Sequence, residues 1–245
     1  MKRRRVVSFT LFAGFLAVAV ASLVRANGDW RTASHEPVGL APDAASTPEP
    51  VVQVYAARTF GARGLFGSHT WIAAKPANAR AWTVYEVIGW RLRWSDSVVA
   101  IHERAPDARW YGNAPELLAD RRGAGVDALI ARIDSAARAY PYANEYTMWP
   151  GPNSNTFTAW IARNVPELRL DLPPTAIGKD YAGTLVATAP SGSGVQLSLA
   201  GLFALTASKV EGLEVNLLGL TFGINPFDPA LKLPILGRVG ASRSP

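Results

Sequence analysis

The stretch Tyr146–Trp160 constrains the fold of this chain more than any other segment. In it, residues that interrupt regular secondary structure come directly before a pattern typical of a helix. The run Pro150–Pro152 reads Pro-Gly-Pro and cannot continue regular structure, since proline lacks the backbone N–H and fixes φ. Phe157 and Ile161 then recur at the spacing of one helical face. The pattern predicts a tight loop followed by a helix that begins near Ser154, with backbone N–H groups open at its first turn.

Two interpretations of Ser154 are open. Asn153, Ser154 and Asn155 are all favoured N-cap residues, and the segment can serve only to begin the helix. Alternatively, Ser154 is a nucleophile, which requires an adjacent general base and a third group that orients this base. His69 is the candidate base, because histidine titrates near neutral pH. Glu86 is the candidate orienting group, since it lies on the next predicted strand among apolar neighbours; an ion pair with a nearby arginine is the simpler alternative.

The run 153–157, Asn-Ser-Asn-Thr-Phe, resembles the N-C-x-x-F segment of the permuted NlpC-like, papain-related hydrolases and acyltransferases. In that superfamily, a histidine on an earlier strand precedes a cysteine that opens a helix. The resemblance implies that Ser154 occupies the cysteine position, with His69 as the base and Glu86 as the group that orients it. The fold that it implies is α+β, a small antiparallel sheet packed with two or three helices in the permuted papain-like arrangement.

A second resemblance is closer and extends across Val52–Gly237. The chain resembles a bacterial family known as domain of unknown function 3750. The matching runs are V-Q-V-Y-A-A-R, H-T-W-I-A-A-K, Y-E-V-I-G-W, W-P-G-P-N-S-N-T-F, P-P-T-A-I-G-K-D-Y and L-P-I-L-G-R. This family implies no activity, so the expected chemistry depends on the residues themselves.

The N-terminal residues indicate export. Four basic residues at positions 2–5 precede Val6–Val24, an uncharged apolar run of 19 residues. Residues 1–26 are therefore expected to be a cleaved signal peptide or an uncleaved membrane anchor with its basic end in the cytoplasm. Both alternatives place the remainder on the periplasmic side, and the second anchors it in the inner membrane.

Charge gives no support to nucleic-acid binding. The formal net charge is +6, but five of the 25 basic residues lie within residues 1–26. Without that segment, 20 basic residues face 19 acidic ones, a net charge of +1. No concentrated basic stripe remains, and phosphate-backbone binding loses its electrostatic basis. We therefore expect no nucleic-acid partner.

The chain has no cysteine, which excludes disulfides and thiolate metal sites. It also has no H-E-x-x-H motif, no EF-hand loop and no complete G-x-G-x-x-G or phosphate-binding loop. We expect neither a protein-ligated metal nor a cofactor. A serine nucleophile would also not be oxidised, whereas the thiol of an exported cysteine can be.

Periodicity and composition divide the rest of the chain into three parts. Residues 27–50 are rich in Pro, Ala and Ser and are expected to form a disordered tether. Residues 51–182 are expected to form the α+β core, and residues 183–245 a β-rich, hairpin-forming segment packed on that core. Within the core, the patterns predict strands at 51–58, 69–75, 82–90 and 97–102, a loop at 106–115, and helices near 126–133 and from 154.

The C-terminal segment alternates between polar and apolar residues. Val195–Thr206 and Leu213–Ile224 are expected to pair as two strands around a turn at Lys209–Gly212. Two paired strands alone are marginal in water, so their apolar face needs a cover. We expect this cover to be the Val51–Trp90 sheet or its helices, with a membrane surface as the alternative. The apolar face consists of Leu197, Leu199, Val215 and Leu217.

Eight tryptophans are a heavy aromatic load. Most are expected in the core, although a row of aromatic rings can also line a groove for sugar rings or acyl chains. The groove predicted near Ser154 is lined by Trp71, Trp110, Trp149, Asn153 and Asn155.

The sequence is compatible with two candidate functions from different classes of protein. The first is a cell-envelope hydrolase or acyl/amide transferase, with Ser154 as nucleophile, His69 as base and Glu86 as orienting group. The second is a catalytically inactive module that binds an envelope glycan or lipid in the same groove. In both cases the partner is a small molecule, glycan or lipid of the envelope. A Ser154 hydroxyl within hydrogen-bond reach of a His69 ring nitrogen would favour the enzyme.

Overall fold

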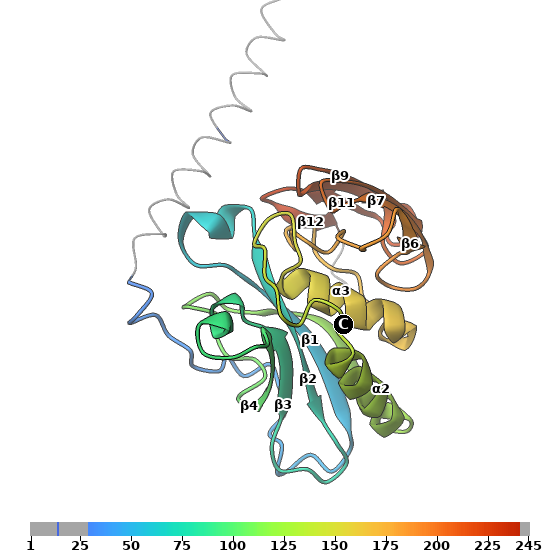
Figure 1. Ribbon diagram of the computed structural model, residues 1–245. Coiled ribbons are helices and arrows are strands. Elements are labelled where there is room, and N and C mark those ends of the chain that lie inside the picture. Colours follow the sequence, from blue (N-terminus) through green and yellow to red (C-terminus); the bar gives the residue numbers. More distant parts are fainter. Residues whose placement is uncertain (1–13, 15–28, 241–245) are drawn as a thin grey trace, which may run out of the picture.

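The computed structural model describes residues 29–240 together with Gly14 (Figure 1). Apart from Gly14, the expected signal peptide or anchor at residues 1–26 lies outside the described residues. Within the described part, no helix is long and apolar enough to span a membrane.

A five-stranded antiparallel sheet forms the first half of the molecule, in the order β4-β3-β2-β1-β5. Helices α2 (Val126–Arg138) and α3 (Ser154–Asn164) lie on one of its faces (Figure 1). The sequence did not predict β5, whose residues have little β-branched character; it forms because it pairs along the free edge of β1. The strands are β1 (Val51–Arg58), β2 (Ser68–Lys75), β3 (Thr83–Val87), β4 (Val99–Glu103) and β5 (Glu116–Arg122). Short 3₁₀ helices occupy Gly61–Leu65, Gly89–Arg93 and Pro166–Leu168.

The two faces of this sheet belong to two separate hydrophobic clusters. Val54 and Ile72 pack against α2 and α3, whereas Tyr55, Trp71 and Val84 belong to the cluster on the opposite face. Strand residues alternate between faces, so His69 and Glu86 lie on the face away from the helices.

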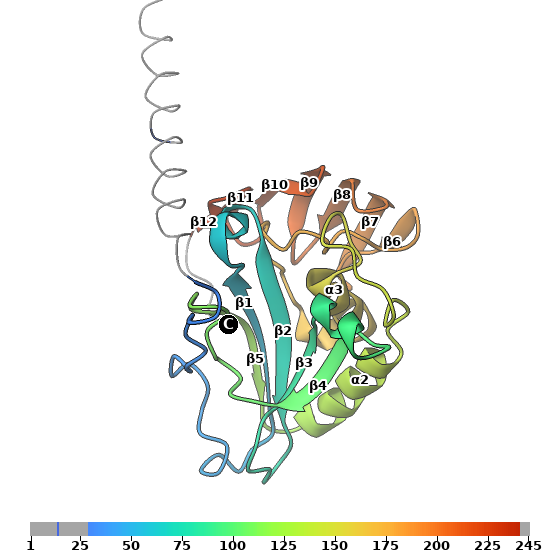
Figure 2. The ribbon, with the colours of Figure 1, turned by 60° about the vertical axis from the view of Figure 1, so that its left-hand side comes forward.

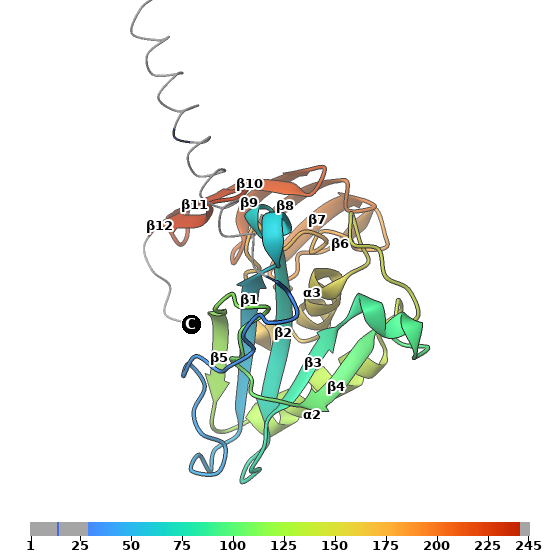
Figure 3. The same cartoon turned by 90° about the vertical axis from the view of Figure 1, so that its left-hand side faces the viewer.

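Residues 29–50, expected to be a disordered tether, instead lie against the face of the first sheet that the helices leave free (Figure 3). The amide N–H of Leu40 donates to Asp107 Oδ2 at 2.6 Å. Trp82 Nε1 donates to the carbonyl of Pro42 at 3.3 Å, and Pro37 forms a β-bridge with Ala108. The prolines prevent this segment from forming a helix or a strand, which is why its sequence resembles a disordered tether. Its backbone is nevertheless ordered, because side chains distant in the sequence form hydrogen bonds with it.

A second antiparallel sheet has seven strands that follow one another in chain order, from β6 to β12. Each of the two long strands expected from the sequence is in fact a hairpin. The turns contain Ala200-Gly201 and Leu218-Gly219, whose φ values of +48°, +71°, +54° and +86° are positive, as the two central residues of a tight hairpin turn require. Three residues connect β7 to β8, and two connect β9 to β10. The strands are β6 (Val186–Thr188), β7 (Gly194–Leu199), β8 (Phe203–Ser208), β9 (Gly212–Leu217), β10 (Leu220–Asn225), β11 (Ala230–Leu233) and β12 (Gly237–Gly240).

This second sheet turns its polar face toward the rest of the protein. Figure 2 shows α3 between the two sheets, and Arg163 of α3 donates to Gln196 Oε1 of β7 at 2.7 Å. The apolar side chains Leu197, Leu199, Val215 and Leu217 are 45%, 59%, 40% and 47% exposed. The expectation that the first sheet or its helices cover them is therefore wrong.

Buried charges attach the second sheet to the core. Lys179 Nζ donates to Glu214 at 2.6 Å and to Asp180 at 2.9 Å. Lys232 Nζ binds Glu214 at 2.6 Å and Asp171 at 2.5 Å. Burial alone would lower the pKa of Lys179, but Asp180 and Glu214 raise it above its ordinary value. These ion pairs explain why the polar face can be the inner one.

Candidate functional site

Asn153 begins α3 and forms a reciprocal capping box. Its Oδ1 accepts from the amide N–H groups of Asn155 at 2.9 Å and Thr156 at 3.2 Å, while Thr156 Oγ1 accepts from the amide of Asn153. A Cβ at Gly178, which has φ +97°, would collide with the Asn153 side chain. The helix starts where the sequence predicted, and Asn153 provides the cap.

Asn155 joins the start of α3 to β2. Its Nδ2 donates to the carbonyl of Ser68 at 2.9 Å, and its Oδ1 accepts from Thr70 Oγ1 at 3.0 Å. Ser154 is only 5% exposed. Within the described part of the chain, no hydrogen bond links the Ser154 hydroxyl to His69. Asn155 reaches the Thr70 hydroxyl and the backbone carbonyl of Ser68, and neither group can act as a general base at neutral pH.

His69 and Glu86 do form the pair that the sequence predicted. His69 Nε2 lies 2.9 Å from Glu86 Oε2. The other carboxylate oxygen, Oε1, accepts from His102 Nε2 at 2.8 Å and Arg104 Nε at 3.0 Å. Burial would raise the pKa of Glu86, but His102, His69 and Arg104 hold it well below its ordinary value. Burial lowers the pKa of His69, although its hydrogen bond to Glu86 acts in the opposite direction.

His102 and Arg104 were not among the predicted site residues. Their spacing of two residues at the end of β4 was the available signal, because it places both side chains on the face that carries Glu86. No group of three His, Asp or Glu side chains in residues 29–240 is arranged to hold a metal ion. The hydrogen bonds make this cluster a buried carboxylate with three nitrogen partners.

An aromatic stack covers the His69 ring on the side of the sheet away from α3. The ring centroids of His69 and Trp110 are 3.7 Å apart with an interplanar angle of 15°, and Trp90 stacks on Trp110 at 6.0 Å. The structure thus brings His69 and Glu86 together, whereas α3, which begins at Ser154, packs on the opposite face of the sheet.

The predicted tryptophans do not line one groove. Trp71 is fully buried and belongs to the core. Trp110 packs on His69, whereas Trp149 is 49% exposed and donates from Nε1 to the carbonyl of Leu218 in the β9–β10 turn at 3.0 Å. The side chain of Asn153 caps α3, and that of Asn155 binds β2, so both amides already have hydrogen-bond partners within the protein.

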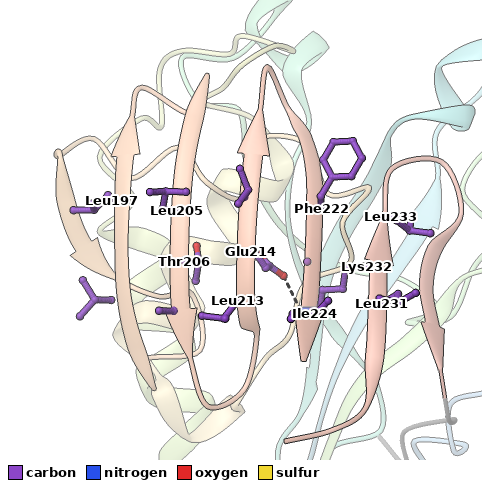
Figure 4. A pocket seen from close by; sticks show the side chains of 14 residues that line it. Leu197, Leu205, Thr206, Leu213, Glu214, Phe222, Ile224, Leu231, Lys232 and Leu233 are labelled. Carbon is purple, nitrogen blue, oxygen red and sulfur yellow. Dashed lines mark hydrogen bonds and ion pairs between the residues drawn. The ribbon is translucent and has the colours of Figure 1, made fainter. Parts of the chain in front are cut away.

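A groove does lie on the outer face of the seven-stranded sheet. Its volume is about 680 Å³, and Figure 4 shows its side chains projecting from β7 to β11. Aliphatic side chains and one phenylalanine dominate the lining, while Glu214 and Lys232 beneath it are paired with each other. The groove is lined chiefly by Leu197, Leu205, Leu213, Val215, Phe222 and Leu231.

The fold and these sites define an α+β protein with two antiparallel sheets and, among the described residues, two α-helices. The chain belongs to the family described as protein of unknown function (DUF3750), whose model matches residues 49–181. The match includes the first sheet, both helices and the loop to Tyr181, and it ends before β6. No curated protein and no solved structure matches the chain.

Proposed function

We propose that this protein is a catalytically inactive lipid-binding module of the cell envelope. The observation that carries the proposal is the outer face of the seven-stranded sheet, which exposes rows of aliphatic side chains around a groove of about 680 Å³. Pockets for small molecules have volumes of roughly 300–1,000 Å³ and are mostly apolar. Location outside the cytoplasm is part of the proposal and is supported by the basic residues and apolar run of residues 2–24.

The lining favours lipid over glycan. Sugar rings need hydrogen-bond partners and aromatic surfaces, and burying their hydroxyls without partners costs free energy. The polar side chains of this sheet, such as Gln196, Thr206 and Asn216, point inward and are buried. Acyl chains have no polar groups to satisfy, so the groove suits them.

Binding of a soluble fatty acid tests this proposal. The full-length protein should enhance the emission of a fatty acid that carries an environment-sensitive fluorophore, at concentrations below micelle formation. Leu205→Glu should weaken binding by about tenfold or more, because it places a carboxylate against the acyl chain. Trp94→Glu, at a 65% exposed position outside the groove, is the matched control and should bind normally. Equal affinity of the two variants would contradict the proposal.

A serine-dependent hydrolase or acyl/amide transferase is the second candidate. The hydrogen bond between His69 and Glu86 favours it, because a buried neutral imidazole held by a carboxylate is the usual base of such a site. Ser154 would have to come within reach of that imidazole from the other side of β2.

Ser154→Cys separates the two candidates, and it would be the single thiol in the chain. We expect this thiol to react with iodoacetamide more slowly than the exposed control Ser135→Cys, because position 154 is buried and has no imidazole partner. The measurement is the second-order alkylation rate at neutral pH. A rate above the control that falls when His69→Ala is added would instead support the hydrolase.

A further inference from the structure

We infer that the outer face of β6–β12 is the surface by which this protein lies on a lipid bilayer. The inference rests on the proposed lipid-binding function and names the lipid as part of a membrane rather than as a single carried molecule. Three observations support it: the continuity of the apolar face, its lack of polar side chains, and the place where the described chain begins.

Strand register makes the apolar face continuous. Leu197 pairs with Leu205, Leu205 with Val215, and Val215 with Phe222. A parallel row on the same face runs from Ala207 through Leu213, Ile224 and Leu231 to Val239. The segments that flank the strands also carry exposed apolar side chains, namely Leu185, Leu218, Phe227 and Leu236.

The size of this face sets it apart from ordinary exposed apolar residues. Seven strands of three to six residues cover about 29 Å by about 17 Å on average, or about 500 Å². The largest apolar patch on a typical monomeric protein is about 300–600 Å² and is often functional. The face therefore lies in the upper part of the range that monomers expose to water.

The central strands offer no polar side chain to a partner. In β7–β9, the polar residues that alternate with the exposed ones, including Ser198, Thr206 and Glu214, are buried, apart from Ser208 at the end of β8, which is half-buried. Protein interfaces carry about one hydrogen bond per 100–200 Å², which would require several polar groups on a face of this size. The hydrocarbon region of a bilayer requires none.

The beginning of the described chain lies on the β12 side of this sheet. Gly112 donates to the carbonyl of Ser34, Asn113 donates to the carbonyl of Thr59, and Arg58 donates to the carbonyl of Ile235 between β11 and β12. Figure 2 shows the first described residues, in blue, on that side of the molecule. The folded part that follows the uncharged run Val6–Val24, which is long enough to cross a bilayer, thus begins near the β12 edge of this sheet.

Single fluorophores test the inference, because the chain has no cysteine of its own. The full-length variants Leu205→Cys and Val215→Cys are labelled with a nitrobenzoxadiazole fluorophore and reconstituted into phosphatidylcholine vesicles, with Ser135→Cys on α2 as the matched control. Nitroxide groups on the lipid acyl chains should quench both labels on the sheet by about half or more, and the control label very little. Circular dichroism confirms that each variant is folded.

Three outcomes would overturn the inference. Equal, weak quenching at all three positions would mean that residues 1–28 alone bring the protein to the vesicle. A blue-shifted label at Leu205 without lipid, together with a dimer in light scattering, would show that a second copy covers the face. Fatty-acid binding without quenching in vesicles would refute the bilayer contact while leaving the proposed lipid binding intact.

Discussion

Glu214→Gln should lower the free energy of unfolding at neutral pH by about 3–5 kcal/mol, the usual cost of breaking a buried ion pair by removing one partner. Glu214 is 3% exposed and binds both Lys179 and Lys232 at 2.6 Å. Without its charge, two buried ammonium groups lose their shared partner, and the polar face of the second sheet loses its main attachment. Urea denaturation followed by circular dichroism measures the loss.

The same carboxylate should make the protein sensitive to acid. Burial would raise the pKa of Glu214, but Lys179 and Lys232 hold it below its ordinary value. A carboxyl group whose pKa is lower in the folded state stabilises the protein above its unfolded pKa of about 4.3, and this stability is lost as pH falls through the folded pKa. The wild-type protein should therefore lose more stability than Glu214→Gln below about pH 4.

Glu167→Gln is the control for this prediction. Glu167 also pairs with an arginine, Arg132, but both side chains are about half exposed, and such pairs contribute little. A loss of less than about 1 kcal/mol in Glu214→Gln, or equal losses in the two variants, would mean that the buried charges do not hold the second sheet in place.

Trp71→Ala should cost about 3–5 kcal/mol, the range measured when a large buried aromatic side chain is removed from a core. Trp71 is fully buried on the face of the first sheet that residues 29–50 cover. It stacks on Tyr55 at 5.7 Å and supports the Arg104 guanidinium at 5.0 Å. Its Nε1 donates to the carbonyl of Pro106 at 2.7 Å.

Two further variants test whether the loss of stability comes from removing a buried ring. Trp71→Phe keeps an aromatic ring but loses the hydrogen bond to Pro106, so it should cost about 1–2 kcal/mol. Trp94→Ala removes a ring that is 65% exposed and should change the stability by about 0.5 kcal/mol or less. Equal denaturation midpoints for Trp71→Ala and Trp94→Ala would show that the cluster around Trp71 contributes no stability.

Local signals allowed the sequence to predict much of the first half of the fold. The start of α3 depends on Pro150–Pro152, the Asn153 cap and the helical spacing of Phe157 and Ile161, all within a dozen residues. Four strands of the first sheet follow from their own alternation. β5 could not be found in this way, because its pairing with β1 joins Val51 to Arg122 across the chain.

The candidate site was predictable only in part. Glu86 required a partner because its face was otherwise apolar, and the structure supplies His69 together with His102 and Arg104. Whether Ser154 meets His69 depends on which face of β2 packs against α3. Thr70 and Ile72 take that face, so His69 points away from the helix.

By itself the sequence determined that the C-terminal strands have one polar and one apolar face, since alternation with a period of two is visible in any such strand. Only the tertiary structure decided which face is buried. Lys179, Asp180 and Asp171 lie outside these strands, yet they neutralise Glu214 and Lys232 and allow the polar face to pack inward. Burial of a polar face depends on partners that are distant in the chain, and strand periodicity contains no information about them.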